Sequence, residues 1–155
     1  NLALGREAGT LPFFVDSDSS ASHVVSPQAG GREGSITVPL TTVDAFARSI
    51  DAPVSFIKID AEGAEPDILA GAAETLARDR PSVFIEFNLF TLMALSNMNP
   101  RRMLEELCAT FPYVYRFAQG SHWPIASEAD IINYLHEMLT THRITTDLYC
   151  SFGPL

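Results

Sequence analysis

Acidic residues follow two short apolar runs of the sequence, at positions where they could meet. Asp60 comes directly after residues 54–59, and Glu86 and Asn88 lie at the end of residues 82–87. In open α/β sheets, ligands bind beyond the carboxyl ends of the strands, so neighbouring strands would bring these side chains to one crevice. A carboxylate that closes a buried strand must be paired, hydrated within a ligand pocket or bound to a cation. Asp60 is therefore the strongest candidate for a functional residue.

The turn that leaves the first run carries further acids. Glu62 and Gly63 follow Asp60, and a glycine at this place permits a tight turn. Glu65 precedes Pro66, the favoured first residue of a helix, so we interpret Glu65 as a charge that complements the helix dipole. Glu62 has the same simple alternative.

Cation chemistry is one kind of chemistry that suits these residues. Carboxylate and amide oxygens from Asp60, Glu86 and Asn88 would suit Mg²⁺, so a metal-dependent hydrolase or phosphoryl-transfer enzyme is one hypothesis. Glu86 has the alternative of pairing with a nearby arginine. His122 and Trp123, in a loop between a predicted strand and a predicted helix, are predicted to edge a substrate pocket.

The order of apolar segments predicts the elements that would position these residues. Period-two or continuous apolar runs predict strands at 11–15, 35–40, 54–59, 82–87, 113–117 and 146–152. Continuous apolarity at 54–59 is typical of a parallel strand buried on both faces. Strand, helix and strand between residues 54 and 87 form a right-handed βαβ unit, which indicates an α/β fold.

Helix starts and loops complete this prediction. Capping boxes are expected at Thr41–Asp44 and Ser127–Asp130, and helices are expected from Pro66 to Asp79 and after Asn99. Residues 16–35 are predicted to form a long polar loop, and residues 89–99 a flexible cap over a pocket.

Composition limits the class of protein. A chain of 155 residues is long enough for one domain with one core, and it has no apolar run of the roughly 20 residues that cross a membrane. Its net charge is −9, and Lys58 is the single lysine among ten basic residues, so we expect no general nucleic-acid partner and no membrane partner. Cys108 and Cys150 are expected to be buried thiols of a cytoplasmic protein.

Five segments together carry a family pattern: residues 38–44, residues 56–65 (FIKIDAEGAE), residues 69–72, Arg80-Pro81 and residues 84–87. They resemble the FkbM-type methyltransferase family over roughly residues 1–88. The resemblance implies a Rossmann-like methyltransferase sheet that is mostly parallel with a late antiparallel strand. It also implies S-adenosylmethionine as donor and a hydroxyl of a sugar, a polyketide or a similar small molecule as acceptor.

The resemblance also implies roles for individual residues. Asp60 would end the fourth strand and face the methyl-transfer site as general base or acceptor anchor, together with Glu62. Glu86 and Asn88 would orient the acceptor. The donor would contact Asn1, Asp60 and Ala61, whereas Mg²⁺ remains an alternative that we do not favour.

The family's glycine-rich donor loop and the acid of its second strand would both precede Asn1. Residues 1–155 are therefore predicted to be the C-terminal part of a single methyltransferase domain that lacks its first strands. This chain by itself could then be inactive as a methyltransferase. The alternative hypothesis is a non-enzymatic fragment that only associates with partners. Loss of the first strand would leave the strand at 54–59 with an open edge, so we expect it to pair with another copy or with a missing segment.

Overall fold

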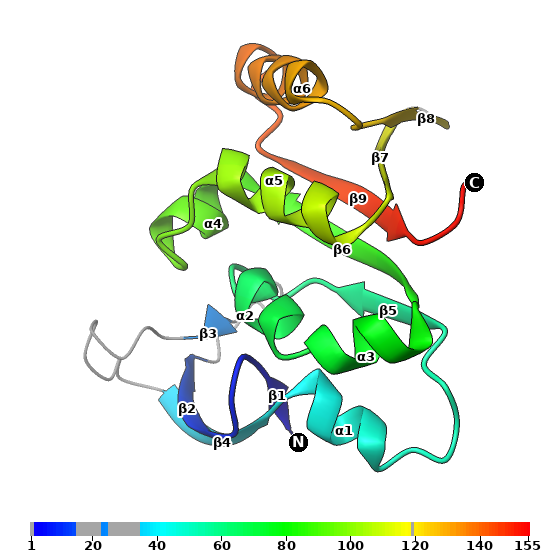
Figure 1. Ribbon diagram of the computed structural model, residues 1–155. Coiled ribbons are helices and arrows are strands. Elements are labelled where there is room, and N and C mark those ends of the chain that lie inside the picture. Colours follow the sequence, from blue (N-terminus) through cyan, green and yellow to red (C-terminus); the bar gives the residue numbers. More distant parts are fainter. Residues whose placement is uncertain (1, 15–22, 25–34, 119) are drawn as a thin grey trace.

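A computed structural model describes residues 2–14, 23–24, 35–118 and 120–155, whose strands form two sheets (Figure 1). The smaller sheet has the order β1 (Ala3–Leu4), β4 (Ser35–Thr41), β2 (Gly9–Phe14), β3 (His23–Val24). The larger sheet has the order β5 (Phe56–Ile59), β6 (Ser82–Asn88), β9 (Thr145–Ser151), β7 (Tyr113–Ala118), β8 (Ser121–Pro124). The helices are α1 (Val43–Arg48), α2 (Glu65–Ala70), α3 (Ala73–Asp79), α4 (Leu89–Ala94), α5 (Pro100–Thr110) and α6 (Glu128–Thr140).

Strand directions in the larger sheet correct the prediction of a mostly parallel sheet. β5 and β6 pair in parallel as the two strands of the βαβ unit, but the β6–β9, β9–β7 and β7–β8 pairs are antiparallel. Because β9 runs against both of its neighbours, β6 and β7 point the same way. A short hairpin strand, β8, follows β7 and adds a further antiparallel pair that the sequence pattern did not predict. The fold is thus a mixed α/β arrangement.

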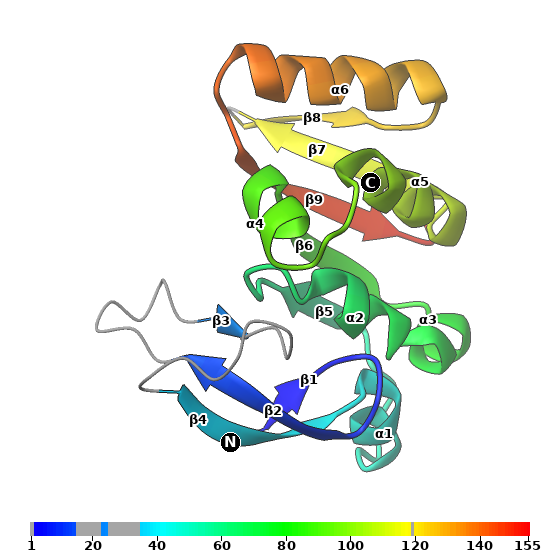
Figure 2. The same ribbon diagram turned by 90° about the vertical axis from the view of Figure 1, so that its left-hand side faces the viewer.

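Helices α2 to α5 lie on one side of the larger sheet (Figures 1 and 2). The side chains of β6 alternate accordingly: Val83, Ile85 and Phe87 are fully buried beneath the helices, whereas Phe84 and Glu86 on the other face are only half-buried. In β5, Ile59 is buried but Phe56 is 55% exposed. The prediction that residues 54–59 are buried on both faces is therefore wrong for the described residues, in which β5 forms an edge of its sheet.

Local capping explains where the helices begin. Ser127 and Asp130 form the predicted capping box at α6, and Asn99 caps α5 through bonds from the backbone N–H groups of Arg101 and Arg102. At α1 the cap is Thr42 rather than Thr41, because the Thr42 hydroxyl accepts the N–H of Ala45.

Asp44 was predicted to belong to a capping box, but it binds the start of another helix instead. Its carboxylate accepts the backbone N–H groups of Glu74 and Thr75 at the start of α3, at 3.1 and 2.7 Å. Burial raises the pKa of Asp44, but these hydrogen bonds outweigh burial and hold the pKa below its usual value. The acid thus ties α1 to α3, far along the chain.

The helix predicted from Pro66 to Asp79 is two helices, interrupted at Gly71. A Cβ atom on Gly71 would lie 2.1 Å from the carbonyl oxygen of Gly5, so only glycine fits at this point. The carbonyl oxygen of Gly71 in turn accepts the N–H of Asp44. Close packing of the β1–β2 connection against the βαβ unit therefore breaks the helix.

The two predicted loops have different outcomes. Most of residues 16–35 lie outside the described residues. Residues 89–94, predicted as a flexible cap, form helix α4, which Asn88 caps by accepting the N–H groups of Phe90 and Thr91.

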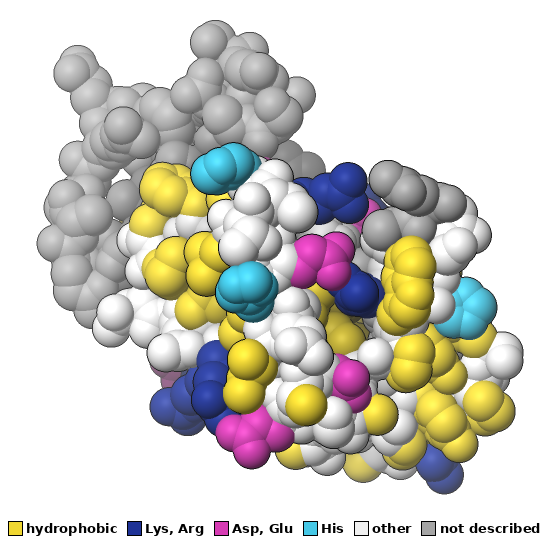
Figure 3. Space-filling model, turned by 90° about the horizontal axis from the view of Figure 1, so that it is seen from above, with side chains coloured by type: hydrophobic (Ala, Val, Ile, Leu, Met, Phe, Trp, Pro, Cys, Tyr) yellow, Lys and Arg dark blue, Asp and Glu magenta, His cyan; other side chains and the backbone are white. Residues whose placement is uncertain are grey.

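Several general expectations concern the surface and the thiols. Cys150 is fully buried, Cys108 is half-buried, and both are free thiols. None of the helices in the described part of the chain is long and apolar enough to cross a membrane. On the face shown in Figure 3, the basic side chains lie in separate spots rather than in one basic patch.

Candidate active site

An acidic cluster lies where the parallel strands β5 and β6 end, and we define it as Asp60, Glu62 and Glu86. One carboxylate oxygen from each residue lies within 4.8 Å of the other two. Asp60 follows β5 directly, Glu62 lies in the turn after it, and Glu86 stands on β6. Asp147 is the cross-strand partner of Glu86 on β9 and adds a fourth carboxylate beside the cluster. The structure thus brings together three of the residues that the sequence singled out.

Glu86 is the most perturbed member of the cluster. Its Oε2 atom is inaccessible to solvent and has no hydrogen-bond partner among the described residues. Burial, followed by repulsion from Glu62 and Asp60, raises the pKa of Glu86 from 4.5 to about 7. A carboxyl group in this state exchanges its proton near neutral pH, which is the property required of a general base.

Asp60 occupies a different environment from the one expected for the end of a buried strand. Its side chain is exposed, and its Oδ2 accepts a hydrogen bond from the Lys58 ammonium at 2.9 Å. This contact raises the pKa of Lys58. Burial and the negative charge of Asp60 raise the pKa of Asp147. The positive charge of Lys58 partly opposes this rise. Lys58 is thus the cation at this acidic end of the sheet, and it is paired with Asp60 rather than with Glu86.

Glu65 holds the turn that carries Asp60 and Glu62. Its carboxylate is 2% exposed and accepts the backbone N–H of Ala61 at 2.8 Å and that of Gly63 at 2.9 Å. Burial raises the pKa of Glu65, although these hydrogen bonds oppose the rise. Glu65 does lie in the first turn of α2, as its interpretation as a charge at the helix start requires, but its buried carboxylate also holds the preceding turn, which the sequence did not predict.

The conformation of the turn shows why this support is needed. Glu62 adopts φ = 48° and Gly63 adopts φ = 100°, and a left-handed conformation is unfavourable for a residue such as glutamate. A Cβ on Gly63 would lie 3.0 Å from the carbonyl oxygen of Thr91, and the Ser96 hydroxyl donates to the Gly63 carbonyl oxygen. The C-terminal end of α4 therefore packs against the acidic turn.

Two of the other predicted site residues are engaged in local structure. The Oδ1 atom of Asn88 caps α4, which leaves its NH₂ group as the part able to contact a ligand. The backbone N–H of Ala61 donates to Glu65, and the Ala61 carbonyl oxygen accepts the N–H of Ala64. A bound methyl donor could therefore contact Ala61 through the Ala61 side chain. Asn1 lies outside the described residues.

His122 and Trp123 are not brought to the acidic cluster. They lie on β8, at the opposite edge of the sheet, with β9 and β7 between β8 and β6. Three strand spacings of about 4.8 Å place them roughly 14 Å from β6. The guanidinium of Arg116 lies over the Trp123 ring, 5.1 Å from its centroid, and the His122 ring meets Tyr115 edge-on.

The donor atoms of the acidic cluster also define what cation it could hold. Three carboxylates with oxygen donors match the preference of Mg²⁺ and Ca²⁺, which avoid nitrogen and sulfur ligands. A bound cation would relieve the mutual repulsion that raises the pKa of Glu86. Asp60, Glu62 and Glu86 are the residues that would bind it.

A family sequence model described as "Methyltransferase FkbM domain" matches residues 1–137. The search of curated proteins and the search of solved structures found no match.

Proposed function

Because the chain belongs to the FkbM methyltransferase family, we propose that it takes part in S-adenosylmethionine-dependent O-methylation. The proposed acceptor is a hydroxyl group of a sugar, a polyketide or a similar small molecule. The acceptor hydroxyl would lie against the acidic cluster.

The observation that carries this proposal is the half-buried carboxyl of Glu86, whose Oε2 has no hydrogen-bond partner in the described part of the chain and whose pKa is about 7. A neutral hydroxyl is a weak nucleophile, and its proton must leave as the bond to the methyl carbon forms. A carboxylate with a pKa near neutral is well matched to take that proton. We therefore propose Glu86 as the general base.

The other acids have complementary roles in the proposal. Asp60 and Glu62 would accept hydrogen bonds from the acceptor and orient it, and the NH₂ group of Asn88 would donate one. Orientation matters because in-line displacement demands close alignment of the two reactants. S-adenosylmethionine would supply a methyl group already activated on a cationic sulfonium.

The charge of the site supports a cationic donor, and in the proposal the carboxylates lie at the acceptor end. Four carboxylates, from the acidic cluster and Asp147, attract a sulfonium. Methyl transfer moves positive charge away from sulfur and toward the acceptor oxygen. Carboxylates near that oxygen stabilise the transition state more than the bound reactants, which is the condition for catalysis.

Divalent-cation chemistry is the competing function, because the same three carboxylates could bind Mg²⁺. A metal-dependent hydrolase or phosphoryl-transfer enzyme would turn over a phosphate ester only when Mg²⁺ is present. p-Nitrophenyl phosphate with and without Mg²⁺ tests this directly.

The main test is transfer of labelled methyl from S-adenosylmethionine to a panel of hydroxylated sugars and polyketides, with thermal shift by S-adenosylhomocysteine as a binding assay. We expect Glu86→Gln to lower transfer by about 10²- to 10⁴-fold, the usual contribution of a general base. Glu105→Gln, at an exposed position on α5, is the matched control. Absence of both binding and transfer, or full activity of Glu86→Gln, would reject the proposal.

A further inference from the structure

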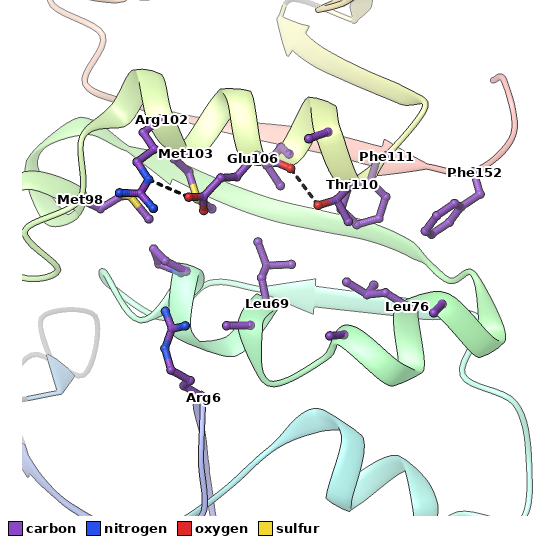
Figure 4. A pocket seen from close by; sticks show the side chains of 16 residues that line it. Arg6, Leu69, Leu76, Met98, Arg102, Met103, Glu106, Thr110, Phe111 and Phe152 are labelled. Carbon is purple, nitrogen blue, oxygen red and sulfur yellow. Dashed lines mark hydrogen bonds and ion pairs between the residues drawn. The ribbon is translucent and has the colours of Figure 1, made fainter.

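A cavity of about 660 Å³ opens between α2 and α3 on one side and α5 on the other side (Figure 4). Apolar side chains form most of its lining, including Leu69, Leu76, Met103, Leu107 and Phe111. The cavity is within the range of roughly 300–1,000 Å³ that is usual for small-molecule sites. It lies on the helical side of the sheet, and none of the acidic cluster residues line it.

Small side chains keep this cavity open. Ala70, Ala73 and Ala77 line one side and Ala109 lines the other, and all four are exposed. Larger apolar residues at these positions would fill the space between the two sides. Contiguous apolar surface left open in this way is typical of a binding site.

One end of the cavity is polar. Arg6 and Arg102 line both this cavity and an adjoining one of about 250 Å³, to which Ser96 and Asn97 contribute. Figure 4 shows Arg6 and Arg102 on opposite sides at the same end of the cavity, away from Phe111 and Phe152. Glu106 also lines this end, so the lining changes from apolar to charged along its length.

Both arginines have donors to spare. Arg6 pairs with Asp67 at 3.0 Å, and Arg102 pairs with Glu106 at 2.8 Å. All four side chains are about half exposed or more, and exposed pairs of this kind contribute little to stability. A guanidinium has five N–H donors, so each arginine can bind an anion without leaving its carboxylate.

We propose that this cavity binds an amphipathic anion, with an aliphatic chain between α2–α3 and α5 and a carboxylate or similar head at Arg6 and Arg102. An anionic head is the specific choice, because both arginines at this end of the cavity keep free N–H donors beside their carboxylate partners. The aliphatic chain accounts for the apolar walls. This site is separate from the proposed methyl-transfer site, and the inference does not depend on that function.

The test uses the whole chain and decanoate, below the concentration at which decanoate aggregates, in titration calorimetry. Decyltrimethylammonium has the same chain with the opposite charge, and butyrate has the same head with a short chain. We expect one decanoate site, with the other two probes at least about tenfold weaker, since each buried methylene contributes substantially to transfer. No methyl donor is present, so the result is independent of the proposed function.

Variants on α5 and α3 locate the site. Arg102→Gln should weaken decanoate binding about fivefold, while Arg101→Gln, which loses the same kind of i,i+4 pair beside the cavity, should not. Ala77→Phe should fill the cavity and abolish binding, while Ala129→Phe, at an exposed position of α6, serves as its control. Circular dichroism establishes that each variant is folded.

Three outcomes would overturn the proposal. One is the absence of decanoate binding to the unmodified chain. Another is equal binding of decanoate and decyltrimethylammonium. The third is a folded Ala77→Phe variant that binds decanoate as the unmodified chain does.

Discussion

Glu86 should make the protein less stable as the pH rises from about 4.5 to about 7. The carboxyl has a pKa of about 7 in the folded chain and an ordinary value of 4.5 when unfolded. Below pH 4.5 both states are protonated, so the contribution of this group is at its most favourable. Between the two values the unfolded state ionises first, which stabilises the unfolded chain and lowers the free energy of unfolding.

The size of this effect follows from the two pKa values. Their difference corresponds to at most about 3.4 kcal/mol. Because Glu86 is only half-buried, solvent screening reduces the expected loss to roughly 1–2 kcal/mol. Glu86→Gln removes the ionisation, so at pH 8 the variant should be more stable by that amount, with a melting temperature roughly 3–6 °C higher.

Thermal unfolding between pH 4 and pH 8 measures this effect, in the unmodified chain and in Glu86→Gln. Glu7→Gln, at an exposed position after β1, is the control that should leave the pH dependence unchanged. Identical pH profiles for the unmodified chain and Glu86→Gln would refute the argument that Glu86 is held in an unfavourable ionised state. The same variant should lose methyl transfer, so stability and activity should change in opposite directions.

Four further predictions follow from single contacts. Glu65→Ala leaves the N–H groups of Ala61 and Gly63 unpaired and should cost about 2–4 kcal/mol in urea unfolding; a cost under 0.5 kcal/mol would contradict its role in the turn. Gly71→Ala should cost about 1–3 kcal/mol through the clash with Gly5, and an unchanged urea midpoint would disprove the close approach. If the acidic cluster binds Mg²⁺, adding it at pH 8 should raise the melting temperature of the unmodified chain but not of Glu86→Gln, whereas an equal rise in both would place the ion elsewhere. We also propose self-association through the open edge of β5, which sedimentation should detect as dimers and which a monomer at all concentrations would exclude.

Local sequence signals predicted much of the fold. The order of strand, helix and strand predicted the parallel pair β5–β6. The helix after Asn99 and the capping box at Ser127 depend on neighbours within a few residues. Such signals can be read directly, because both partners of the contact lie in the same short segment.

Long-range contacts account for what the sequence could not predict. The break at Gly71 is caused by Gly5, and Asp44 serves α3 rather than its own helix. A regular apolar stripe across residues 66–79 gives no sign of either contact. The antiparallel direction of β9, by contrast, confirms the late antiparallel strand that the family resemblance implies, although both of its partners are distant in the chain.

The acidic cluster illustrates both cases. Its members could be selected because Asp60 and Glu86 follow apolar runs of adjacent strands. The division of roles could not be predicted, because it depends on three-dimensional surroundings. Lys58 pairs with Asp60, Glu65 is buried in the turn, and one oxygen of Glu86 has no partner among the residues that the structure describes. One signal for Glu65 was available, namely an acid placed directly before Pro66 and two residues after a glycine.

The position of β9 has a consequence for how the chain reaches this fold. β9 is the last strand of the sequence, yet it lies between β6 and β7 and makes all the hydrogen bonds that join them. During synthesis, β6 and the β7–β8 hairpin must therefore remain separate until residue 151 has emerged, with β6 exposing a bare edge meanwhile. Insertion of β9 closes the sheet and couples its two halves, so the slowest folding step should be the capture of β9 between β6 and β7.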